Sequence, residues 1–257
     1  MNKKLQALKY IVFDYLSASL AWSLFYLYRK FFIEPDKFGI LPERVFDRQF
    51  VLGIIILPLG WLLAYYLTGF YKNIYRKSRI NELVQTLATS IIGVTFIFFF
   101  ILLDDFVSSY KSYYKVYIVL FALHFFITAI CRFILSSITN YKIKKGVIGF
   151  KTVIIGSNQR ALKMYQEISS KKHSSGNDFI GFIHLDEKNG FSDQLKSTLP
   201  HLGEYKDLKK IIFDNNVDEI IIAIESWEHK YLEKIINELN DFGVIIKIIP
   251  DVYDILS

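Results

Sequence analysis

Four long apolar stretches occupy much of the first 145 residues, and a different pattern begins near Gly146. Each stretch is 21 residues long, and a helix needs about 20 apolar residues to cross the ~30 Å hydrocarbon core of a bilayer. The second and third stretches contain no charged residue, so neither has a polar face to turn towards water. The pattern therefore predicts four transmembrane helices, at residues 8–28, 50–70, 83–103 and 116–136.

After Gly146, short apolar runs alternate with amphipathic stretches, which is typical of βαβ units that build a parallel sheet. The runs that read as buried strands are residues 151–156, 179–186, 217–224 and 243–249. We expect the first of them in the middle of the sheet, in the order 2-1-3-4. The predicted fold class is thus a four-helix transmembrane bundle (residues 1–145) followed by a small α/β Rossmann-like domain with a parallel sheet (residues 146–257).

Composition and charge support a membrane protein. The chain is 52% hydrophobic and 22% charged, which is too apolar for an ordinary cytosolic domain. Residues 1–145 hold 18 Lys and Arg against 8 Asp and Glu, whereas residues 146–257 hold 13 against 17. The basic residues cluster beside the apolar stretches, so lipid head groups are their expected partner. We do not expect the protein to bind nucleic acid. The single cysteine, Cys131, excludes a disulfide within the chain.

The Lys and Arg residues of the connecting segments predict the orientation of the helices. Eleven of them lie on the side of the N-terminus, the loop between the second and third stretches and the segment after the fourth, against seven on the opposite side. Both termini and the soluble domain are therefore expected to face the cytoplasm.

Polar residues inside the apolar stretches are costly and invite a functional interpretation. Asp14 and Arg132 each lie roughly 6 to 9 Å below the same membrane surface, at 1.5 Å per residue. They could pair with each other, or each could extend to the interface by itself. His124 lies near the middle of the fourth stretch, where we expect an interhelical hydrogen-bonding group.

Ligands of an open parallel sheet bind beyond the carboxyl ends of its strands, where the strand order reverses. The candidate nucleotide-binding residues at that crevice are Gly156, Ser157, Asn158, Arg160 and Ser226. Gly156 stands where a dinucleotide fingerprint has its first glycine, but Asn158 replaces the second, which lets a pyrophosphate approach the backbone. Arg160 could still supply charge at the helix N-terminus. The alternative is a relic of the fold that binds nothing.

Several short motifs make the chain resemble a family. They are residues 68–76 and 79–83 after the second apolar stretch and, in the soluble half, residues 153–156, 180–183, 199–203, 218–223 and 249–251. In this order they resemble the N-terminal, CoA-binding-like portion of bacterial polyprenyl glycosylphosphotransferases, the bacterial sugar transferases of exopolysaccharide, O-antigen and capsule synthesis. The same architecture resembles membrane-bound nucleotide-sugar dehydratases and epimerases.

The resemblance implies a location in the bacterial inner membrane and a catalytic domain beyond this portion, which uses Mg²⁺ to move a sugar-1-phosphate from a UDP-sugar to undecaprenyl phosphate. Within the chain we expect no catalytic residues, no metal site and no cofactor. The Asp-Glu pairs at residues 186–187 and 218–219 lie at strand ends, where carboxylates are usually just solvated. The chain is interpreted as a membrane-anchoring and regulatory portion of such a transferase. A nucleotide-sugar-binding membrane sensor and a scaffold module that forms homo-oligomers remain alternatives.

Overall fold

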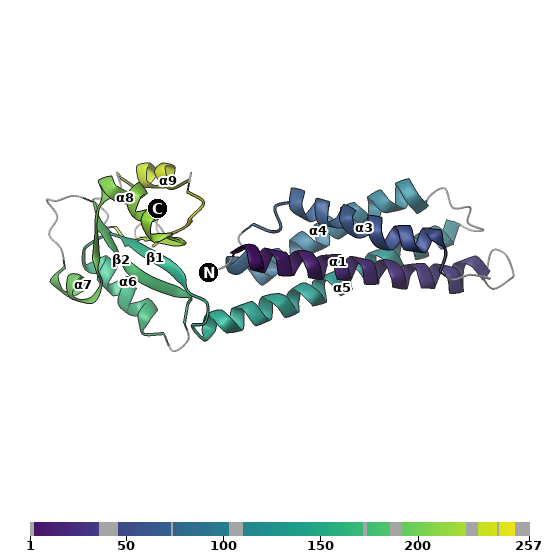
Figure 1. Cartoon of the computed structure of the whole chain (residues 1–257), viewed down its shortest axis with the longest axis horizontal. Coiled ribbons are helices and arrows are strands. Elements are labelled where there is room, and N and C mark those ends of the chain that lie inside the picture. Colours follow the sequence, from purple (N-terminus) through teal and green to yellow (C-terminus); the bar gives the residue numbers. More distant parts are fainter. Residues whose placement is uncertain are drawn as a thin grey trace. The chain divides into compact units, whose positions relative to one another are not determined.

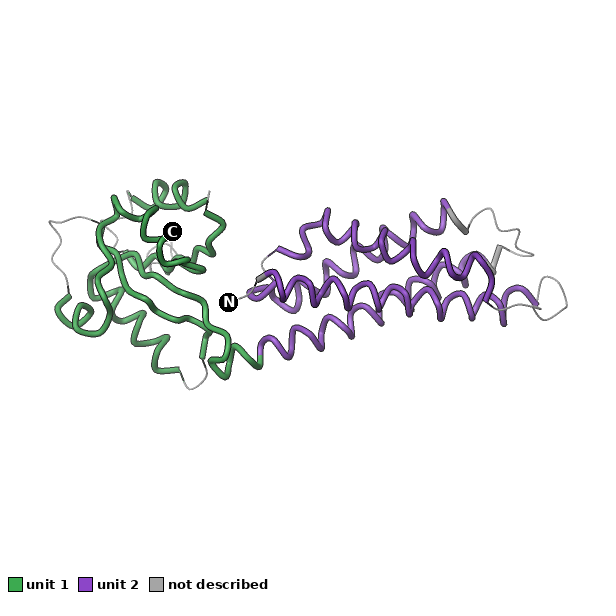
Figure 2. Tube along the Cα trace, in the orientation of Figure 1, with its two compact units in different colours: residues 1, 141–257 green, residues 2–140 purple. Residues whose placement is uncertain are grey.

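A computed structural model gives the structure of the chain and describes residues 3–35, 46–72, 74–102, 110–171, 174–185, 192–224, 231–240 and 242–249. The chain divides into two compact units, residues 2–140 and residues 141–257, the second of which also takes in Met1 (Figure 2). The boundary predicted between residues 145 and 146 lies five residues after this division and just after the helix Tyr110–Lys144 ends.

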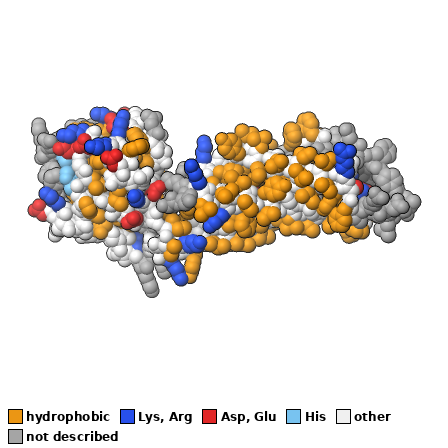
Figure 3. All heavy atoms as spheres, in the orientation of Figure 1, with side chains coloured by type: hydrophobic (Ala, Val, Ile, Leu, Met, Phe, Trp, Pro, Cys, Tyr) orange, Lys and Arg blue, Asp and Glu red, His pale blue; other side chains and the backbone are white. Residues whose placement is uncertain are grey.

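The first unit consists of long helices (Figure 1). They are α1 (Lys3–Tyr28), extended by the π-helical turn η1 (Arg29–Ile33); α3 (Arg48–Leu67); α4 (Arg79–Ile97), extended by η3 (Phe98–Leu102); and α5 (Tyr110–Lys144). Four segments are long and apolar enough to cross a membrane: Lys4–Ile33, Arg48–Leu67, Arg79–Phe100 and Tyr113–Lys144. Hydrophobic side chains cover the visible face of this unit, and Lys and Arg gather near its ends (Figure 3).

Indole rings packed on glycines bring neighbouring helices together. Trp22 of α1 lies against Gly53 of α3, where a Cβ atom would come within 2.0 Å of the indole nitrogen. Trp61 of α3 lies in the same way against Gly93 of α4, where a Cβ would come within 2.3 Å of the ring. Small residues let membrane helices approach closely, so both glycines are needed for this packing.

The second helix is shorter than predicted, because the chain turns back after Leu67. Gly69 adopts a left-handed φ of 67°, and its N–H donates to the carbonyl of Tyr66. The N–H of Phe70 donates to the carbonyl of Tyr65, and the two rings pack with centroids 5.8 Å apart. These bonds form a Schellman motif with its usual hydrophobic contact. The predicted stretch 50–70 is therefore wrong at its last residues, whereas the fourth helix, with 35 residues, is longer than predicted at both ends.

The second unit is a doubly wound α/β domain. Its elements are β1 (Phe150–Ile155), α6 (Gln159–Ser169), β2 (Asn177–His184), α7 (Asp193–Thr198), β3 (His201–Glu204), η4 (Tyr205–Asp207), α8 (Leu208–Asn215), β4 (Glu219–Ile222), α9 (Leu232–Asn240) and β5 (Ile245–Ile248). The strands form one sheet in the order β3-β2-β1-β4-β5, and every pairing is parallel. The predicted order of the four expected strands is confirmed, and β3 is an additional edge strand.

Alternate side chains of the central strands enter two separate cores. Val153 and Ile155 of β1 pack with apolar side chains of α8 and α9, whereas Ile154 packs with side chains of α6 and α7. Helices thus cover both faces of the sheet, which explains why the strand segments are apolar at consecutive positions. The carboxyl ends of β1 and β4 lie side by side, because Ile155 pairs with Ile222.

Candidate functional site

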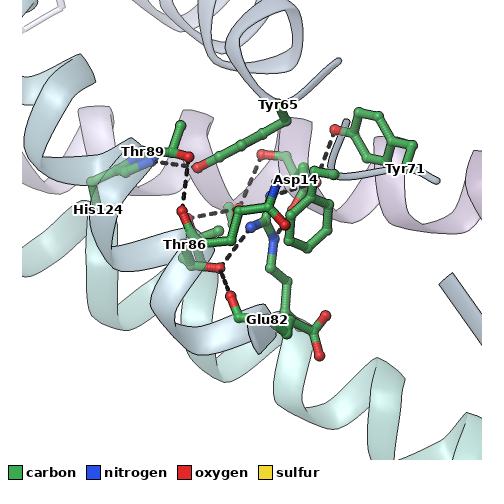
Figure 4. A network of polar contacts seen from close by, with 12 residues as sticks. Asp14, Tyr65, Tyr71, Glu82, Thr86, Thr89 and His124 are labelled. Atoms are coloured by element: carbon green, nitrogen blue, oxygen red, sulfur yellow. Dashed lines mark hydrogen bonds and ion pairs between the residues drawn. The ribbon is translucent and has the colours of Figure 1, made fainter. Parts of the chain in front are cut away.

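The structure brings Asp14 and Arg132 together inside the helical unit. The Arg132 Nε donates to Asp14 Oδ1 over 2.8 Å, and Nη2 donates to Oδ2 over 2.9 Å (Figure 4). Both side chains are only 1% exposed. The remaining guanidinium nitrogen, Nη1, donates to the hydroxyl of Thr86 over 2.7 Å. Of the two alternatives for these charges, the structure therefore shows the pair, a bidentate one that joins α1, α5 and α4.

The turn after α3 completes the surroundings of this ion pair. The hydroxyl of Tyr71 donates to Asp14 Oδ2 over 2.9 Å, and the Phe70 ring centroid lies 3.5 Å from the guanidinium carbon of Arg132. The ring of Tyr65 lies 4.0 Å from the same carbon. The aromatic faces attract the cation, and the phenol supplies the carboxylate with a further donor. The buried side chains of Asp14 and Arg132 therefore have partners both for their charges and for their hydrogen-bonding groups.

Sequence reasoning did not assign a role to Phe70 and Tyr71. Both lie within residues 68–76, one of the motifs that carry the family resemblance. The signal that could have placed them is Thr68 followed by Gly69 at the end of an apolar stretch, since glycine there favours a helix stop with the next residues folded back. We infer that this motif serves to close the polar cluster around Arg132.

A second cation contacts Phe70. The Lys77 ammonium lies 3.5 Å from the ring centroid and donates to the carbonyl of Phe70 over 3.2 Å and to the Gln85 side chain. Burial, with the nearby positive charge of Arg132 as the second cause, lowers the pKa of Lys77 to about 8. Lys77 therefore loses its proton more readily in the folded than in the unfolded chain, and this difference contributes stability that is gained as the pH rises from about 8 towards the ordinary lysine value of 10.5.

We expect Lys77 to react with an amine-specific acylating reagent with a half-maximal rate near pH 8. Peptide mass spectrometry after brief labelling at a series of pH values measures this. The same chain unfolded in denaturant is the reference, because Lys77 then has the ordinary lysine pKa of 10.5 and should reach its half-maximal rate at a higher pH. Identical pH profiles of Lys77 in the folded and the unfolded chain would contradict the assignment.

His124 extends the polar cluster towards the middle of the helices. Its Nε2 lies 2.9 Å from the hydroxyl of Tyr65, and its ring stacks on Trp61 with centroids 3.6 Å apart. Between the levels of Arg132 and His124 along α5, the hydroxyls of Ser17 and Thr128 lie 3.3 Å apart and connect α1 with α5. His124 therefore has the interhelical hydrogen bond expected of it. The cluster thus links the four helices, since Asp14 lies on α1, Tyr65 on α3, Thr86 on α4 and Arg132 on α5. A shift of α1 against α5 would leave a buried charge unpaired.

The carboxyl end of β1 is pressed against β4. Gly156 has a φ of 136°, and a Cβ atom there would lie 2.2 Å from the carbonyl oxygen of Ala223. The next residue, Ser157, is 3% exposed, and its carbonyl accepts the N–H of Ser192 over 3.0 Å. Gly156 thus allows the close approach of two strands, which is a structural role whether or not a ligand binds nearby.

The other candidate residues of the crevice lie at the start of α6. Asn158 is the N-cap, with extended backbone and no capping bond from its side chain. Arg160 Nη2 donates to the carbonyl of Ile249, just after β5, over 3.2 Å. The guanidinium therefore contacts the protein's own backbone at the position where we expected it to meet a phosphate. Ser226, with its neighbour Glu225, lies outside the described residues.

The Asp-Glu pair at residues 218 and 219 lies at the opposite end of the sheet from the crevice. Glu219 is fully buried, accepts from Asn177 Nδ2 over 2.6 Å and forms an ion pair with Lys247. The expectation that this pair is just solvated is therefore wrong for Glu219, because the fold surrounds it with donors. The pair at residues 186–187 lies outside the described residues.

Two histidines meet at the edge of the sheet. His184 Nδ1 and His201 Nε2 lie 2.8 Å apart, and burial, together with the neighbouring His184, lowers the pKa of His201. One ring nitrogen must carry the shared hydrogen, so two positive rings are disfavoured. Within the described part of the chain, no group of three or more His, Cys, Asp or Glu is placed to hold a metal ion.

Comparison with known proteins identifies the family. A family model described as a CoA-binding domain matches residues 66–250, so the chain belongs to the CoA-binding domain family. The match includes Phe70, Tyr71 and Arg132, but Asp14 precedes it.

Two curated relatives narrow the class. Over 123 residues the chain is 21% identical to the UDP-glucose:undecaprenyl-phosphate glucose-1-phosphate transferase of Xanthomonas campestris pv. campestris. The aligned residues make up 48% of this chain and 25% of the relative. Over 209 residues it is 22% identical to the capsular polysaccharide biosynthesis protein CapD of Staphylococcus aureus, covering 80% of this chain and 34% of that protein. The chain is thus related to bacterial sugar transferases, and it spans about a quarter to a third of the length of these relatives.

Proposed function

We propose that the chain is the non-catalytic membrane-anchoring and regulatory N-terminal portion of a polyprenyl-phosphate sugar-1-phosphate transferase of exopolysaccharide, O-antigen or capsule biosynthesis. The observation that carries the proposal is the family match, which runs without a break from the end of α3 to the end of β5. The match thus includes α4 and α5 together with the α/β domain, and both relatives align with part of the same region. The proposed role is to hold the α/β domain at the membrane where a lipid-linked sugar is made.

The functional test is an assay of the product of the whole gene, read past the codon of Ser257. We expect membranes that contain this product to transfer sugar-1-phosphate from a UDP-sugar to undecaprenyl phosphate in the presence of Mg²⁺. Membranes that contain residues 1–257 alone should form no lipid-linked product. Transfer by residues 1–257 would show that the chain itself is catalytic.

A second candidate is the membrane-anchored half of a nucleotide-sugar dehydratase or epimerase. The resemblance of the sequence motifs to such enzymes supports this candidate, and the relative that covers 80% of the chain is named for capsular polysaccharide biosynthesis without naming a reaction. The same assay separates the candidates, since a dehydratase or epimerase alters the nucleotide-sugar and forms no lipid-linked product.

We further propose that the protein lies in the bacterial inner membrane with both termini and the α/β domain in the cytoplasm. This orientation places the larger number of Lys and Arg, eleven against seven, on the cytoplasmic side. In a Cys131→Ser background, a cysteine at position 108 should react with a membrane-impermeant maleimide added to intact cells, and a cysteine at position 257 should react only after lysis. The reverse pattern would overturn the orientation. Both positions lie outside the described residues.

The crevice of the α/β domain is proposed to take a nucleotide-sugar, if it takes a nucleotide at all, and not NAD(P). Asn158 stands where a glycine would let a pyrophosphate reach the backbone, and Arg160 contacts Ile249. Calorimetry on the whole chain in nanodiscs should give no heat of binding with millimolar NAD(P), whereas a UDP-sugar is expected to give a saturable signal. Saturable binding of NAD would contradict this proposal. The absence of a heat of binding with every UDP-sugar would favour the scaffold alternative.

A further inference from the structure

A groove of about 300 Å³ lies between α1 and α3, away from the polar cluster around Arg132. Its walls are largely apolar and include Leu52 and Ile56, which are 44% and 58% exposed and therefore face outwards from the bundle. Gly53 and Trp22 also line the groove, and the Trp22 indole occupies the space that a side chain at Gly53 would fill. In a bilayer such a groove is filled by hydrocarbon.

The groove has a polar end. Arg29 and Gln49 line it together with the apolar residues, and they lie next to the end of α1 at Tyr28 and the start of α3 at Arg48. Because the first predicted transmembrane stretch ends at residue 28 and α3 begins at Arg48, we expect this end of the groove at the level of the lipid phosphates. Along the groove the lining therefore changes within a few helical turns from Arg29 and Gln49 to apolar side chains. A phospholipid has the matching order, with a charged head group followed by hydrocarbon chains.

The charges around Arg29 favour an anionic head group. Lys30 is engaged with two carboxylates, because its Nζ lies 2.9 Å from Glu34 and 3.5 Å from Asp47. The Nε of Arg29 also lies 3.9 Å from Glu34, and its planar guanidinium carries five N–H donors, so it can contact a carboxylate and a phosphate together. Among the described residues at the polar end of the groove, Arg29 and Lys30 balance Glu34 and Asp47, and the exposed Arg48 adds one positive charge.

We propose that this groove is a binding site for one anionic phospholipid. The phosphate contacts Arg29 and Gln49, and one acyl chain lies over Gly53 between Leu52 and Ile56. The volume is about ten times the ~30 Å³ share of one water molecule in the liquid, which gives room for a stretch of one chain and not of two. The second chain of the lipid remains in the bilayer. This site is independent of the transfer reaction proposed above.

Native mass spectrometry of the whole chain, purified in detergent and mixed with defined lipids, tests the site. We expect one phosphatidylglycerol to stay bound at collision energies that remove phosphatidylcholine. Arg29→Gln should lower the fraction with bound phosphatidylglycerol at least fivefold. Arg48→Gln is the matched control, because it removes a positive charge from the same end without lining the groove, and it should change that fraction less than twofold. Ile56→Phe, which narrows the groove, should lower retention of phosphatidylglycerol while the charges stay in place.

Thermal unfolding of each variant in detergent verifies that a loss of lipid is not a loss of fold. If Arg29→Gln does not fold, Ile56→Phe still decides the question, since it alters only the hydrocarbon part of the site. Equal retention of phosphatidylglycerol and phosphatidylcholine, or equal losses in Arg29→Gln and Arg48→Gln, would overturn the proposal. Retention of a polyprenyl phosphate in preference to phosphatidylglycerol would overturn the choice of lipid.

Discussion

Replacing Asp14 with Asn is expected to lower the free energy of unfolding by about 3–5 kcal/mol, because Arg132 is then left as an uncompensated buried charge. Arg132→Gln should have an effect of similar size. The double variant should recover much of the loss, since neither of its amides carries a charge. Unfolding in mixed micelles with increasing dodecyl sulfate, followed by tryptophan fluorescence, measures all three variants.

Tyr71→Phe is the graded control for this cycle. It removes only the hydrogen bond to Asp14 Oδ2 and leaves the ion pair intact, so about 1.5–3 kcal/mol is expected. Strict additivity of the effects of Asp14→Asn and Arg132→Gln would show that the two side chains do not act as a pair. An effect of Tyr71→Phe as large as that of Asp14→Asn would assign the stability to the turn after α3 and not to the ion pair.

Gly156→Ala is expected to destabilise the α/β domain by roughly 2–5 kcal/mol, through the left-handed φ and through overpacking against the neighbouring strand. The added Cβ would meet the Ala223 carbonyl at 2.2 Å, and a backbone oxygen of a central strand cannot move aside as a side chain can. Hydrogen exchange of the amides of β1 and β4 in the whole chain should accelerate. Substitution of Gly156 would thus disturb the fold before it reported on any ligand.

Gly243→Ala is the matched control. Gly243 also has a left-handed φ, of 62°, but no atom lies within 4 Å of its added Cβ. Only the conformational cost remains there, on the order of 1 kcal/mol. If the two alanine variants were equally unstable, the contact with Ala223 would not matter and the conformation of Gly156 alone would explain its presence.

Parts of the polar cluster could be anticipated from the sequence, but its assembly could not. The depth of Asp14 and Arg132 follows from counting residues along two helices, whereas pairing depends on how both helices rotate about their axes across 118 positions of sequence. Phe70 and Tyr71 were out of reach for another reason, because Phe70 counts as the last residue of the predicted stretch 50–70 and Tyr71 follows it directly. Only the helix stop at Gly69 turns them back towards Arg132.

The short strand β3 shows the corresponding limit in the α/β domain. His201–Glu204 has four residues, one of them glycine, and carries no apolar alternation that would mark a strand. It forms because β2 offers it an open edge with free backbone groups. The contact of Arg160 with Ile249 could not be predicted for a similar reason, because it depends on the curvature and strand order of the whole sheet.

The sequence by itself determined the architecture, because the lengths of the apolar stretches and the alternation of apolar runs are local properties that water and lipid act upon directly. It also carried the family motifs at residues 68–76 and in the soluble half. Only the tertiary structure decided what those motifs and charges do. The roles of Asp14, Arg132, Tyr71 and Gly156 rest on contacts between segments far apart in the chain, and such contacts are selected by close packing, which no local pattern records.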